Sequence, residues 1–391
     1  MTETADVIII GAGVHGTSLA FHLAERGTSV IVIERAWIGA GATGRSSGLV
    51  RMHYDLLAET KLAWASFPYF TGWAERVGGE CGFTNTGFLW IEGGDGEARV
   101  AANVASHRAL GIDTSVVHAD EIARLAPAMA LDGDEVAAWE PASGYADPSV
   151  ASTGFMRAAK AKGATLVQGV EVTSIATTDD GTRVTGVGTT KGDFSAPIVV
   201  NVAGPWAAGV GAMVGLDVPV TTWRHDTGYI GVPGSTPRPI PVVIDNVREM
   251  YTRPEGADLM LIGLEDGSII GGSPDRDTAN AEPGFEDVVT DRIVRRLPTL
   301  AEGTFRAAHS GQDGLSPDQR SILGAAGPDG FYLDCGHSGT GFKTSPAIGL
   351  GMAELILDGA ATSVDLTPFA PQRFAEGKLL VGEHGGTPIW R

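Results

Sequence analysis

The sequence is poor in the residues that mark disulfide-rich and membrane-spanning proteins. It contains only 2 cysteines, Cys81 and Cys335, among 391 residues. This number allows a single disulfide at most, and two free thiols in a reducing compartment are the simpler interpretation. No apolar run approaches the roughly 20 residues that a membrane-spanning helix needs, and the N-terminus lacks the basic segment and long apolar core of a signal peptide. We therefore expect a cytoplasmic protein without a membrane span.

Basic residues are scarce as well. Lysine and arginine together number 28, against 47 aspartates and glutamates, which gives a formal net charge of −19. Proteins that bind nucleic acids need clustered basic side chains, so no nucleic-acid partner is expected. Lysine occurs at only six positions: 61, 160, 162, 191, 343 and 378. Because lysine is this rare, Lys343 inside a glycine-rich loop is a candidate for function.

Glycine, in contrast, is abundant at 55 residues, and the first glycine cluster has a recognisable context. The apolar run Val7–Ile10 reads as a strand buried on both faces. The turn Gly-Ala-Gly-Val-His-Gly (11–16) follows it, and apolar residues at helical spacing continue to residue 26. A second strand over residues 29–33 ends at Glu34. This order of strand, glycine turn, helix and strand predicts a dinucleotide-binding βαβ unit.

Each part of the unit has a physical role in binding a dinucleotide. Gly11 permits the tight turn, Gly13 lets the backbone approach a pyrophosphate, and Gly16 lets the helix pack on the strand. The helix N-terminus offers unpaired N–H groups to the phosphates, and Glu34 can accept hydrogen bonds from a ribose. The pattern does not separate FAD from NAD, so an NAD-dependent dehydrogenase stays open at this point. The predicted contacts are Gly11, Ala12, Gly13, Val14, His15, Gly16, Glu34 and Arg35.

The rest of the chain predicts an α/β fold with an α+β second domain. Helical patterns at 61–77, 98–110 and 149–162 alternate with strand patterns at 164–175 and 197–202. Between about 218 and 275, short apolar runs separated by Gly, Pro and Asp predict an antiparallel sheet. Near the C-terminus, a strand at 331–334 and a glycine loop precede a helix expected to begin at Pro346, capped by Ser345.

We therefore expect a Rossmann-type nucleotide-binding domain that is interrupted by a mainly antiparallel-sheet substrate-binding domain. The nucleotide-binding domain would comprise residues 1–80, 145–217 and 310–391. The substrate-binding domain would comprise residues 81–144 and 218–309. A chain of this length accommodates about two domains of roughly 100–200 residues each.

Further glycine-bearing segments carry a family resemblance. They are Gly-Ala-Thr-Gly-Arg-Ser-Ser-Gly-Leu-Val-Arg (41–51), Val-Asn-Val-Ala-Gly-Pro-Trp (200–206), Ser-Pro-Asp (316–318) and Gly-His-Ser-Gly-Thr-Gly-Phe-Lys (336–343). In this order they resemble motifs of the FAD-dependent D-amino-acid oxidase/sarcosine oxidase family, and the likeness runs from residue 6 to about residue 358. The resemblance implies FAD as the cofactor. It adds these expected FAD contacts: Ala42, Thr43, Arg45, Ser46, Ser47, Gly48, Val172, Ala203, Gly204, Trp206, Gly339, Thr340, Gly341, Phe342 and Lys343.

Departures from the family motifs narrow the expectation. The segment Gly311-Gln312-Asp313 lacks the cysteine to which monomeric sarcosine oxidases attach the flavin, and Arg45 stands where dimethylglycine dehydrogenases have a flavin-linked histidine. We therefore expect non-covalent FAD. Gln312 also replaces the carboxylate-binding arginine of D-amino-acid and glycine oxidases. The strand 258–263 lacks the lysine that promotes reaction with oxygen in monomeric sarcosine oxidase, so fast oxidase activity is not expected. The electron acceptor is either O2 or an acceptor protein, and the missing lysine makes a dehydrogenase credible.

The resemblance also implies a substrate site. Matched motif to motif, Arg51 and Lys343 would hold the carboxylate of a small amine substrate, and Tyr251 is a further candidate for the pocket. Arginine can grip a carboxylate with two parallel bonds, and lysine adds a compact charge. We predict Lys343, Arg51 and Tyr251 as catalytic and substrate-binding residues. His53 and Tyr54 allow either a pocket or a packing role.

The expected reaction is the oxidation of a C–N bond in a secondary or N-methyl amino acid. A hydride would pass from the carbon beside nitrogen to flavin N5, and water would hydrolyse the resulting imine. The same fold and the same pair of cations also fit the oxidation of a 2-hydroxy acid. A third alternative is a flavin subunit of a heteromeric dehydrogenase, whose electrons leave through a partner protein.

Overall fold

The computed structural model describes residues 3–264 and 267–384. Its first layer is a sheet in the order β10 (Thr165–Gln168), β3 (Val30–Glu34), β2 (Val7–Ile10), β14 (Ile198–Asn201), β22 (Phe331–Cys335) and β21 (Ile322–Ala325). All neighbours are parallel except β21 and β22, which pair antiparallel. The predicted βαβ unit is therefore confirmed, and it forms the middle of this sheet.

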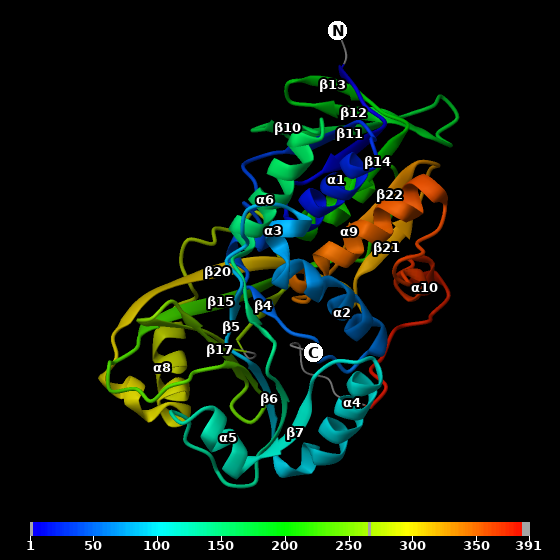
Figure 1. The fold of residues 1–391 in the computed structure, drawn as a ribbon. Coiled ribbons are helices and arrows are strands. Elements are labelled where there is room, and N and C mark those ends of the chain that lie inside the picture. Colours follow the sequence, from blue (N-terminus) through cyan, green and yellow to red (C-terminus); the bar gives the residue numbers. More distant parts are fainter. Residues whose placement is uncertain (1–2, 265–266, 385–391) are drawn as a thin grey trace.

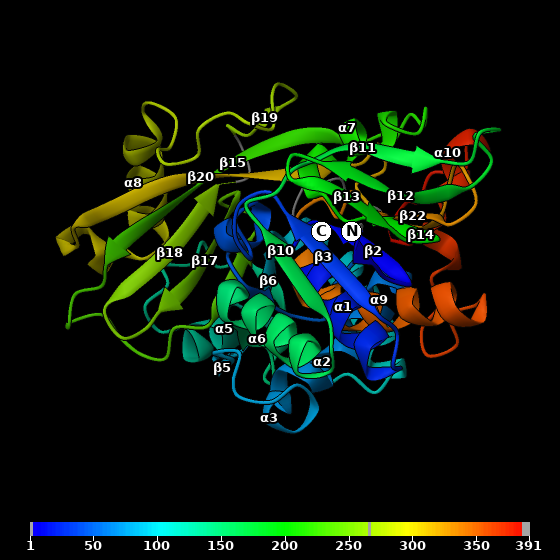
Figure 2. The ribbon, with the colours of Figure 1, turned by 90° about the horizontal axis from the view of Figure 1, so that it is seen from above.

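Both faces of the first sheet are covered. Helices α1 (Val14–Glu25), α6 (Pro148–Ala161) and α9 (Gly341–Asp358) pack on one face, and a small sheet of β11 (Val172–Thr177), β12 (Val184–Thr189) and β13 (Gly192–Ser195) covers the other (Figure 2). Alternate residues of β2 consequently enter different cores: Val7 and Ile9 face the helices, and Ile8 and Ile10 face the small sheet. Burial on both faces explains why this strand is continuously apolar.

A second sheet forms the other half of the molecule (Figure 1). Its order is β19 (Ile269–Ile270), β15 (Thr221–Gly231), β18 (Leu259–Leu264), β17 (Met250–Glu255), β16 (Val242–Asp245), β6 (Phe88–Glu92), β8 (Val136–Glu140) and β7 (Ser115–His118), and β20 (Phe305–Leu315) pairs with β15. These pairs are antiparallel apart from β16 with β6. The two-part architecture predicted from the sequence, a Rossmann-type fold with a mainly antiparallel second part, is therefore confirmed.

Helices cover the second sheet as its side-chain alternation requires. Phe88 and Trp90 of β6 pack with the helix α4 (Glu97–Ala109), while Leu89 and Ile91 pack with α5 (Ala119–Leu125). Helix α8 (Phe285–Arg296) covers the far end through Val289 and the apolar side chains of β18. Strand β20 crosses the predicted boundary between residues 309 and 310, and the exact domain limits stay a prediction.

One expected strand proves to be two. The sequence predicted a single strand over 164–175, but the chain forms β10 in the first sheet and β11 in the small sheet. Gly169 between them has φ 65°, a left-handed conformation in which a strand cannot continue. The backbone N–H of Val170 still bonds to the carbonyl of Glu34, the last residue of the neighbouring β3, before the chain enters the small sheet. The change of sheet carries Val172 to the edge of the nucleotide-binding half.

The start of the C-terminal helix was also predicted wrongly. Helix α9 begins at Gly341 with Thr340 as its N-cap, and Pro346 lies inside it. Proline has no N–H, so it leaves the carbonyl of Phe342 without its usual helical donor. The hydroxyl of Ser345 donates to that carbonyl at 2.8 Å. Ser345, which was expected to cap the helix, instead supplies the donor that Pro346 lacks. The helix therefore starts at Gly341, five residues before the predicted position.

The two cysteines and the lengths of the apolar helices bear on the expectations drawn above. Cys81 and Cys335 are buried free thiols. Among the residues that the structure describes, no helix combines the length and the apolar character that crossing a membrane requires.

Candidate active site

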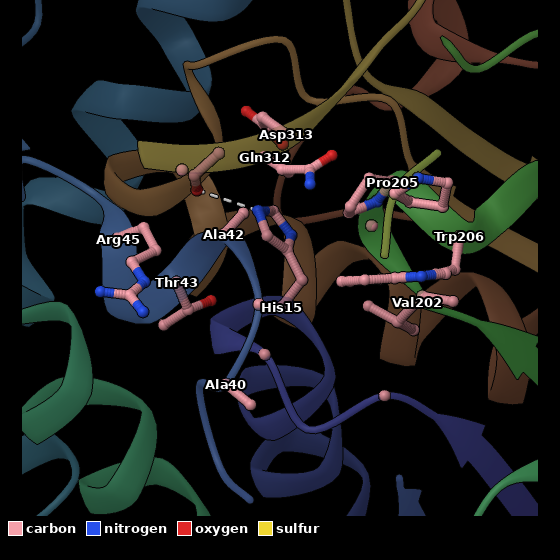
Figure 3. A pocket seen from close by; sticks show the side chains of 18 of the residues that line it. His15, Ala40, Ala42, Thr43, Arg45, Val202, Pro205, Trp206, Gln312 and Asp313 are labelled. Carbon is pink, nitrogen blue, oxygen red and sulfur yellow. Dashed lines mark hydrogen bonds between the residues drawn. The ribbon is translucent and has the colours of Figure 1, made fainter. Parts of the chain in front are cut away.

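A cavity of about 650 Å³ lies where the two halves of the molecule meet. Its wall comes from the glycine turn and the loops after β3 and β14 on one side, and from β15, β17 and β20 on the other. Figure 3 shows His15, Trp206 and, from β20, Gln312 around this space. Sites for small molecules and cofactors usually fall between 300 and 1,000 Å³. The predicted residues that line it are Gly11, Gly13, Val14, His15, Glu34, Arg35, Ala42, Thr43, Arg45, Ser46, Ser47, Val172, Ala203, Gly204, Trp206, Tyr251, Gly339, Gly341 and Phe342.

Other predicted residues lie next to this lining and not in it. Ala12, Gly16, Gly48 and Thr340 belong to the lining turns without reaching the cavity. Gly16 has a packing role, because a Cβ there would lie 2.1 Å from the carbonyl oxygen of Gly11. The predicted segments therefore converge on one cavity, although their individual FAD contacts stay predictions.

The glycine turn is shaped for a dinucleotide. Gly11 has φ 110°, and a Cβ there would lie 2.6 Å from the carbonyl oxygen of Val202, so the position requires glycine. The two carboxylate oxygens of Glu34 accept the N–H groups of Ala12 at 2.9 Å and Ala36 at 2.8 Å. These bonds fix the carboxylate at the end of β3, where its remaining lone pairs can accept ribose hydroxyls. The cradle that a dinucleotide needs is therefore present.

The second flavin loop docks on the same turn. Its first part is the short 3-10 helix η1 (Ala42–Arg45), and the hydroxyl of Thr43 accepts the N–H of Val14 at 3.0 Å. This bond joins the loop to the first residue of α1. The predicted Thr43 is thus a structural link between two segments that the resemblance assigned to FAD.

At another part of the rim, an arginine stacks on a tryptophan. The guanidinium of Arg35 lies 4.1 Å from the centre of the Trp206 ring, and both side chains bond to Asp275 at 2.8 and 2.9 Å. Sequence reasoning predicted Arg35 and Trp206 but missed Asp275. It lies in the loop after β19, and no local pattern shows that this loop returns to β3.

Opposite the nucleotide turn, the cavity wall carries Tyr251 and His225. The Tyr251 hydroxyl lies 3.1 Å from His225 Nε2 and 3.4 Å from the hydroxyl of Thr227. Burial raises the pKa of Tyr251 to about 12 and lowers the pKa of His225 to about 3, so both side chains are neutral over the ordinary pH range. His225 was missed from the sequence, although alternation along β15 with Trp223 and Thr227 is the signal that could have found it.

Gln312 has a structural role at the position where related oxidases have a substrate-binding arginine. Its side-chain nitrogen donates to the carbonyl oxygen of Arg276 at 2.7 Å, and the side chain is buried in the cavity wall. It supports the loop that contains Arg276 and offers no cation to a carboxylate. This placement agrees with the departure from the D-amino-acid oxidase pattern noted above.

Arg51 and Lys343 come together, but behind the cavity wall. They are 2% and 6% exposed. The Arg51 guanidinium carbon lies 4.3 Å, and Lys343 Nζ 5.8 Å, from the centre of the same Tyr54 ring. Burial, aided by the neighbouring Arg51 charge, lowers the pKa of Lys343 well below its usual value, and Glu59 acts in the opposite direction. Within the described residues, neither side chain belongs to the cavity lining, which reaches Gly339, Gly341 and Phe342 beside them.

A buried ion network supports this region. The fully buried Arg320 pairs with Asp55 at 2.9 Å and with Glu59, and the Thr340 hydroxyl donates to Glu59 at 3.3 Å. Helix α2 (Leu57–Thr71) is thereby tied to the loop that precedes Lys343. Sequence reasoning missed this network, because each of its bonded pairs joins distant parts of the chain, and Arg320 and Glu59 are separated by 261 residues.

Comparison with known proteins assigns the family. The profile of the FAD dependent oxidoreductase family (DAO) matches residues 6–355. The chain belongs to this family. FAD is accordingly its cofactor, which removes the NAD-dependent alternative. The cradle formed by the glycine turn and Glu34 fits the dinucleotide part of that cofactor.

The alignments with known relatives extend over almost the whole chain. Human mitochondrial sarcosine dehydrogenase is 29% identical over 92% of the chain, but the chain spans only 40% of that protein. Sarcosine oxidase subunit beta from Rhodobacter capsulatus is 24% identical over 96% of the chain and 90% of the relative. Among solved structures, L-proline dehydrogenase from P. horikoshii is similar at a TM-score of 0.89 and 27% identity, covering 97% of this chain and 100% of the other. Glycine oxidase from Geobacillus kaustophilus reaches 0.83 at 25% identity, with coverages of 95% and 99%.

Proposed function

We propose that this FAD-dependent oxidoreductase oxidises the C–N bond of a small secondary or N-methyl amino acid. Bound FAD supplies the hydride acceptor for such a reaction. The protein's own part is to orient the amine and to exclude bulk water from it. Arg51 and Lys343, which lie just behind the lining beside Gly341 and Phe342, would hold the substrate carboxylate, and Tyr251 in the lining would contact the rest of the substrate.

The observation that carries the proposal is the burial of two basic side chains beside one aromatic ring. Burial, and after it the neighbouring Arg51 charge, lowers the pKa of Lys343 well below its usual value, so the pair is not balanced by the protein alone. A carboxylate between them would relieve the repulsion and form charge-assisted hydrogen bonds. Glu59 offsets only part of the positive charge of Arg51 and Lys343, because it already pairs with Arg320. The site therefore suits an anionic group on a small substrate.

The names of the relatives favour an amine over a hydroxy acid. Two of them are named for sarcosine and one solved structure for L-proline, which are small secondary amino acids with a carboxylate. Close to the cavity the chain also offers neutral hydrogen-bonding groups, Tyr251 and His225, which do not repel an amine. Both features fit a carboxylated amine whose nitrogen lies near the flavin.

FAD is expected to dissociate from this chain without breaking a covalent bond. Arg45, Gln312 and Asp313 occupy the segments at which the family resemblance would place a linking residue, and none of them offers the thiol or imidazole through which the relatives would form that link. Acid or heat precipitation should release the yellow colour into the supernatant. Colour that stays with the precipitated protein would contradict non-covalent binding.

An anaerobic screen tests the substrate class. Sarcosine, L-proline, other N-methyl amino acids and 2-hydroxy acids would each be mixed with the FAD-loaded protein, and loss of flavin absorbance followed. We expect bleaching by one or more secondary amines and none by the matching hydroxy acids. Bleaching by hydroxy acids alone would overturn the amine proposal while leaving the FAD assignment intact.

A second candidate is a flavin subunit that needs a partner to discharge its electrons. It is favoured by the match to sarcosine oxidase subunit beta over 90% of that relative. The absence of a lysine from β18 also suits slow reaction with oxygen. Reduced protein should then reoxidise slowly in air and quickly with an artificial dye. Fast reoxidation by oxygen alone would exclude this candidate.

A further inference from the structure

Two histidines and a glutamate from distant parts of the chain form a buried cluster outside the lining of the FAD cavity. His53 follows β4 (Leu49–Val50), His107 lies in the last turn of α4, and Glu140 ends β8. They are 1%, 1% and 0% exposed. One nitrogen or carboxylate oxygen of each lies within 4.8 Å of the others. The amine oxidation proposed above uses none of these three side chains.

The cluster contains polar atoms that the rest of the described chain does not satisfy. Both ring nitrogens of His53, Nδ1 of His107 and Oε1 of Glu140 are buried without a hydrogen-bond partner among the described residues. Buried polar groups in folded proteins almost always have a partner, which is another protein group, ordered water or an ion. Several unsatisfied atoms in one place therefore indicate a site that an additional group completes.

His107 is held in the form that a metal ligand needs. Its Nε2 lies 3.0 Å from the carbonyl oxygen of Tyr54, which only accepts, so this nitrogen carries the proton of the neutral ring. Burial lowers the pKa of His107 to about 4 against the effect of that bond, and Arg51 and His384 act in the same direction as burial. At neutral pH the lone pair is therefore on Nδ1. A backbone carbonyl on the other nitrogen is a common partner of metal-binding imidazoles.

The two imidazole rings have an arrangement that one ion can share. The ring centres of His53 and His107 are 4.9 Å apart, and the ring planes are at 88° to each other. A metal ion lies close to the plane of each imidazole that binds it, and two perpendicular planes cross along a line that lies in both. With metal–nitrogen bonds of about 2.0–2.1 Å and a tetrahedral angle, the centres of two imidazole ligands are about 5 Å apart. The observed separation matches that value.

Glu140 supplies the negative charge of the cluster. Its Oε2 accepts the N–H of Met52 at 3.0 Å and the hydroxyl of Ser143 at 2.7 Å, which leaves Oε1 for a further partner. Burial raises the pKa of Glu140, against these two bonds and the charge of Arg51. A cation at Oε1 would offset the cost of burying the carboxylate. Two imidazole nitrogens and one carboxylate oxygen form the ligand set of zinc sites that keep a fourth position open.

Arg51 is the charged side chain beside the cluster. Its guanidinium carbon lies 5.4 Å from the centre of the Trp90 ring, on which the His53 ring stacks at 5.2 Å. Its NH1 group donates to the backbone carbonyl of His53. The positive charge of Arg51 opposes a second cation nearby, so the three ligands must hold a metal against it. A metal that fixes His53 would in turn fix the carbonyl to which Arg51 bonds.

We propose that His53, His107 and Glu140 bind a divalent transition-metal ion of the zinc class. The ion ties the segment after β4 to α4 and β8, and so holds the backbone that receives the Arg51 bond. Ligand atoms of a tetrahedral ion are about 3.4 Å apart, so His53, whose ring nitrogens have no partner in the described part of the chain, turns toward the other two ligands on binding. The metal site is separate from the FAD site and does not depend on the identity of the substrate.

The first test uses the FAD-loaded wild-type protein and the metal ions alone. Protein stripped with a chelator would be dialysed against Zn²⁺, and its metal content would be measured by elemental analysis. A parallel titration would use Co²⁺, because a tetrahedral cobalt site absorbs at longer wavelengths than the flavin. We expect one zinc ion per chain and a cobalt band of tetrahedral intensity. Protein that retains no zinc, or that shows no such cobalt band, would overturn the proposal.

Glu140→Gln removes the charge of the site and keeps an acceptor for the Met52 N–H. We expect the dissociation constant for Zn²⁺ to rise about 100-fold, because even the partners of metal ligands change metal affinity by about 10- to 100-fold. His22→Gln is the matched control, since His22 is also buried, has a pKa lowered to about 4 by burial, and lies outside the cluster. Its zinc affinity should be unchanged. No loss in Glu140→Gln would mean an adventitious ion only, and an equal loss in both variants would mean an effect that is not local; either result would refute the site.

A third measurement does not depend on variants that fold. X-ray absorption at the zinc edge of the zinc-loaded wild-type protein reports which atoms surround the ion. We expect the scattering pattern of two imidazoles, with oxygen as the remaining ligand atoms. Zinc bound without two imidazoles would place the ion elsewhere on the chain and would contradict the proposal.

Discussion

Lys343 is buried beside a second cation, and this placement makes its removal informative. Lys343→Met keeps the apolar stem of the side chain and removes its charge. We expect the KM for a carboxylated amine to rise about 10- to 100-fold, because a charge-assisted contact worth roughly 1.5–3 kcal/mol is lost. Steady-state kinetics would measure the change, and flavin absorbance would show that FAD is retained.

Lys61→Met is the control for that substitution. Lys61 is exposed on α2, so its loss should leave the KM unchanged. An amide analogue of the substrate, which lacks the carboxylate, should lose its sensitivity to Lys343→Met. An unchanged KM for the carboxylated amine would remove Lys343 from the substrate site.

Tyr251 has a different signature, because its hydroxyl is neutral at ordinary pH. Burial raises its pKa to about 12 and lowers that of its partner His225 to about 3. Neither group changes charge between about pH 6 and about pH 9. We expect Tyr251→Phe to lower kcat/KM roughly threefold to tenfold, since a net hydrogen bond contributes about 1 kcal/mol. The pH profile should keep its shape, and a limb that disappears in the variant would contradict the assigned charges.

At the scale of single elements, the interior proline of α9 gives a direct test of the revised helix start. Ser345→Ala removes the hydroxyl that bonds to the carbonyl of Phe342, where Pro346 supplies no N–H. We expect the free energy of unfolding to fall by about 1–2 kcal/mol, because a buried acceptor is left without a donor. Denaturant unfolding followed by circular dichroism would measure it.

Ser152→Ala in α6 provides the comparison. Its hydroxyl also bonds to a carbonyl one turn back, Ser149, at 3.2 Å, but no proline interrupts that helix there. The carbonyl keeps its helical N–H donor, so the loss should be small. An equal loss of unfolding free energy in the two variants would show that the Ser345 hydroxyl has no special role in α9.

The elements that the sequence predicted well are those specified by neighbouring residues. The βαβ unit follows from the apolar run Val7–Ile10, the glycine turn and Glu34, all within one short segment. The change of sheet at Gly169 and the early start of α9 were both predicted wrongly, because apolar spacing reveals neither a left-handed glycine nor a serine hydroxyl that bonds to a carbonyl three residues back. Local pattern cannot report that a strand leaves one sheet for another.

The same distinction applies to the site. Motif segments placed Gly11, Arg35 and Trp206 in the cavity wall, because each lies inside a recognisable turn. The partners that complete the site were not predictable, since pairs such as His15 with Gly341 are separated by 326 residues. Such pairs become visible only when the elements that carry them, here the starts of α1 and α9, are packed against each other. The chemistry of single motifs was therefore accessible from the sequence, and the side-chain contacts between motifs were not.

At the scale of the whole molecule, each half has its own charged core. In the second sheet, Arg296 pairs with Asp245 at 2.6 Å and with Glu135 at 2.9 Å, and all three side chains are fully buried. Arg296→Met would leave two carboxylates without their counter-ion. Removing one partner of a buried ion pair typically costs about 3–5 kcal/mol. We expect a loss of that size in unfolding free energy at neutral pH.

The pH dependence of that loss has a definite sign. Burial opposes ionisation of Glu135, but its bonds to Arg296 and to backbone N–H groups lower its pKa to about 2. A depressed carboxyl pKa contributes stability that is present above the unfolded value of about 4.3 and is lost as the pH falls toward 2. The difference between Arg296→Met and wild type should therefore shrink in acid. A difference that grows in acid would contradict the ion-pair account.

FAD is expected to join the two halves, because the cavity wall includes both the glycine turn and the strands β15, β17 and β20. A ligand that binds only the folded state stabilises it by RT ln(1 + [L]/Kd), or about 2.7 kcal/mol at a hundredfold excess over Kd. We expect added FAD to raise the Tm of flavin-depleted protein and to slow amide exchange in both halves. AMP, which reaches only the nucleotide side, should protect the glycine turn but not β15 and β17. Equal protection of β17 by AMP and FAD would mean that the flavin end makes no contact with the second sheet, and the proposed substrate wall at Tyr251 would then lie away from the flavin.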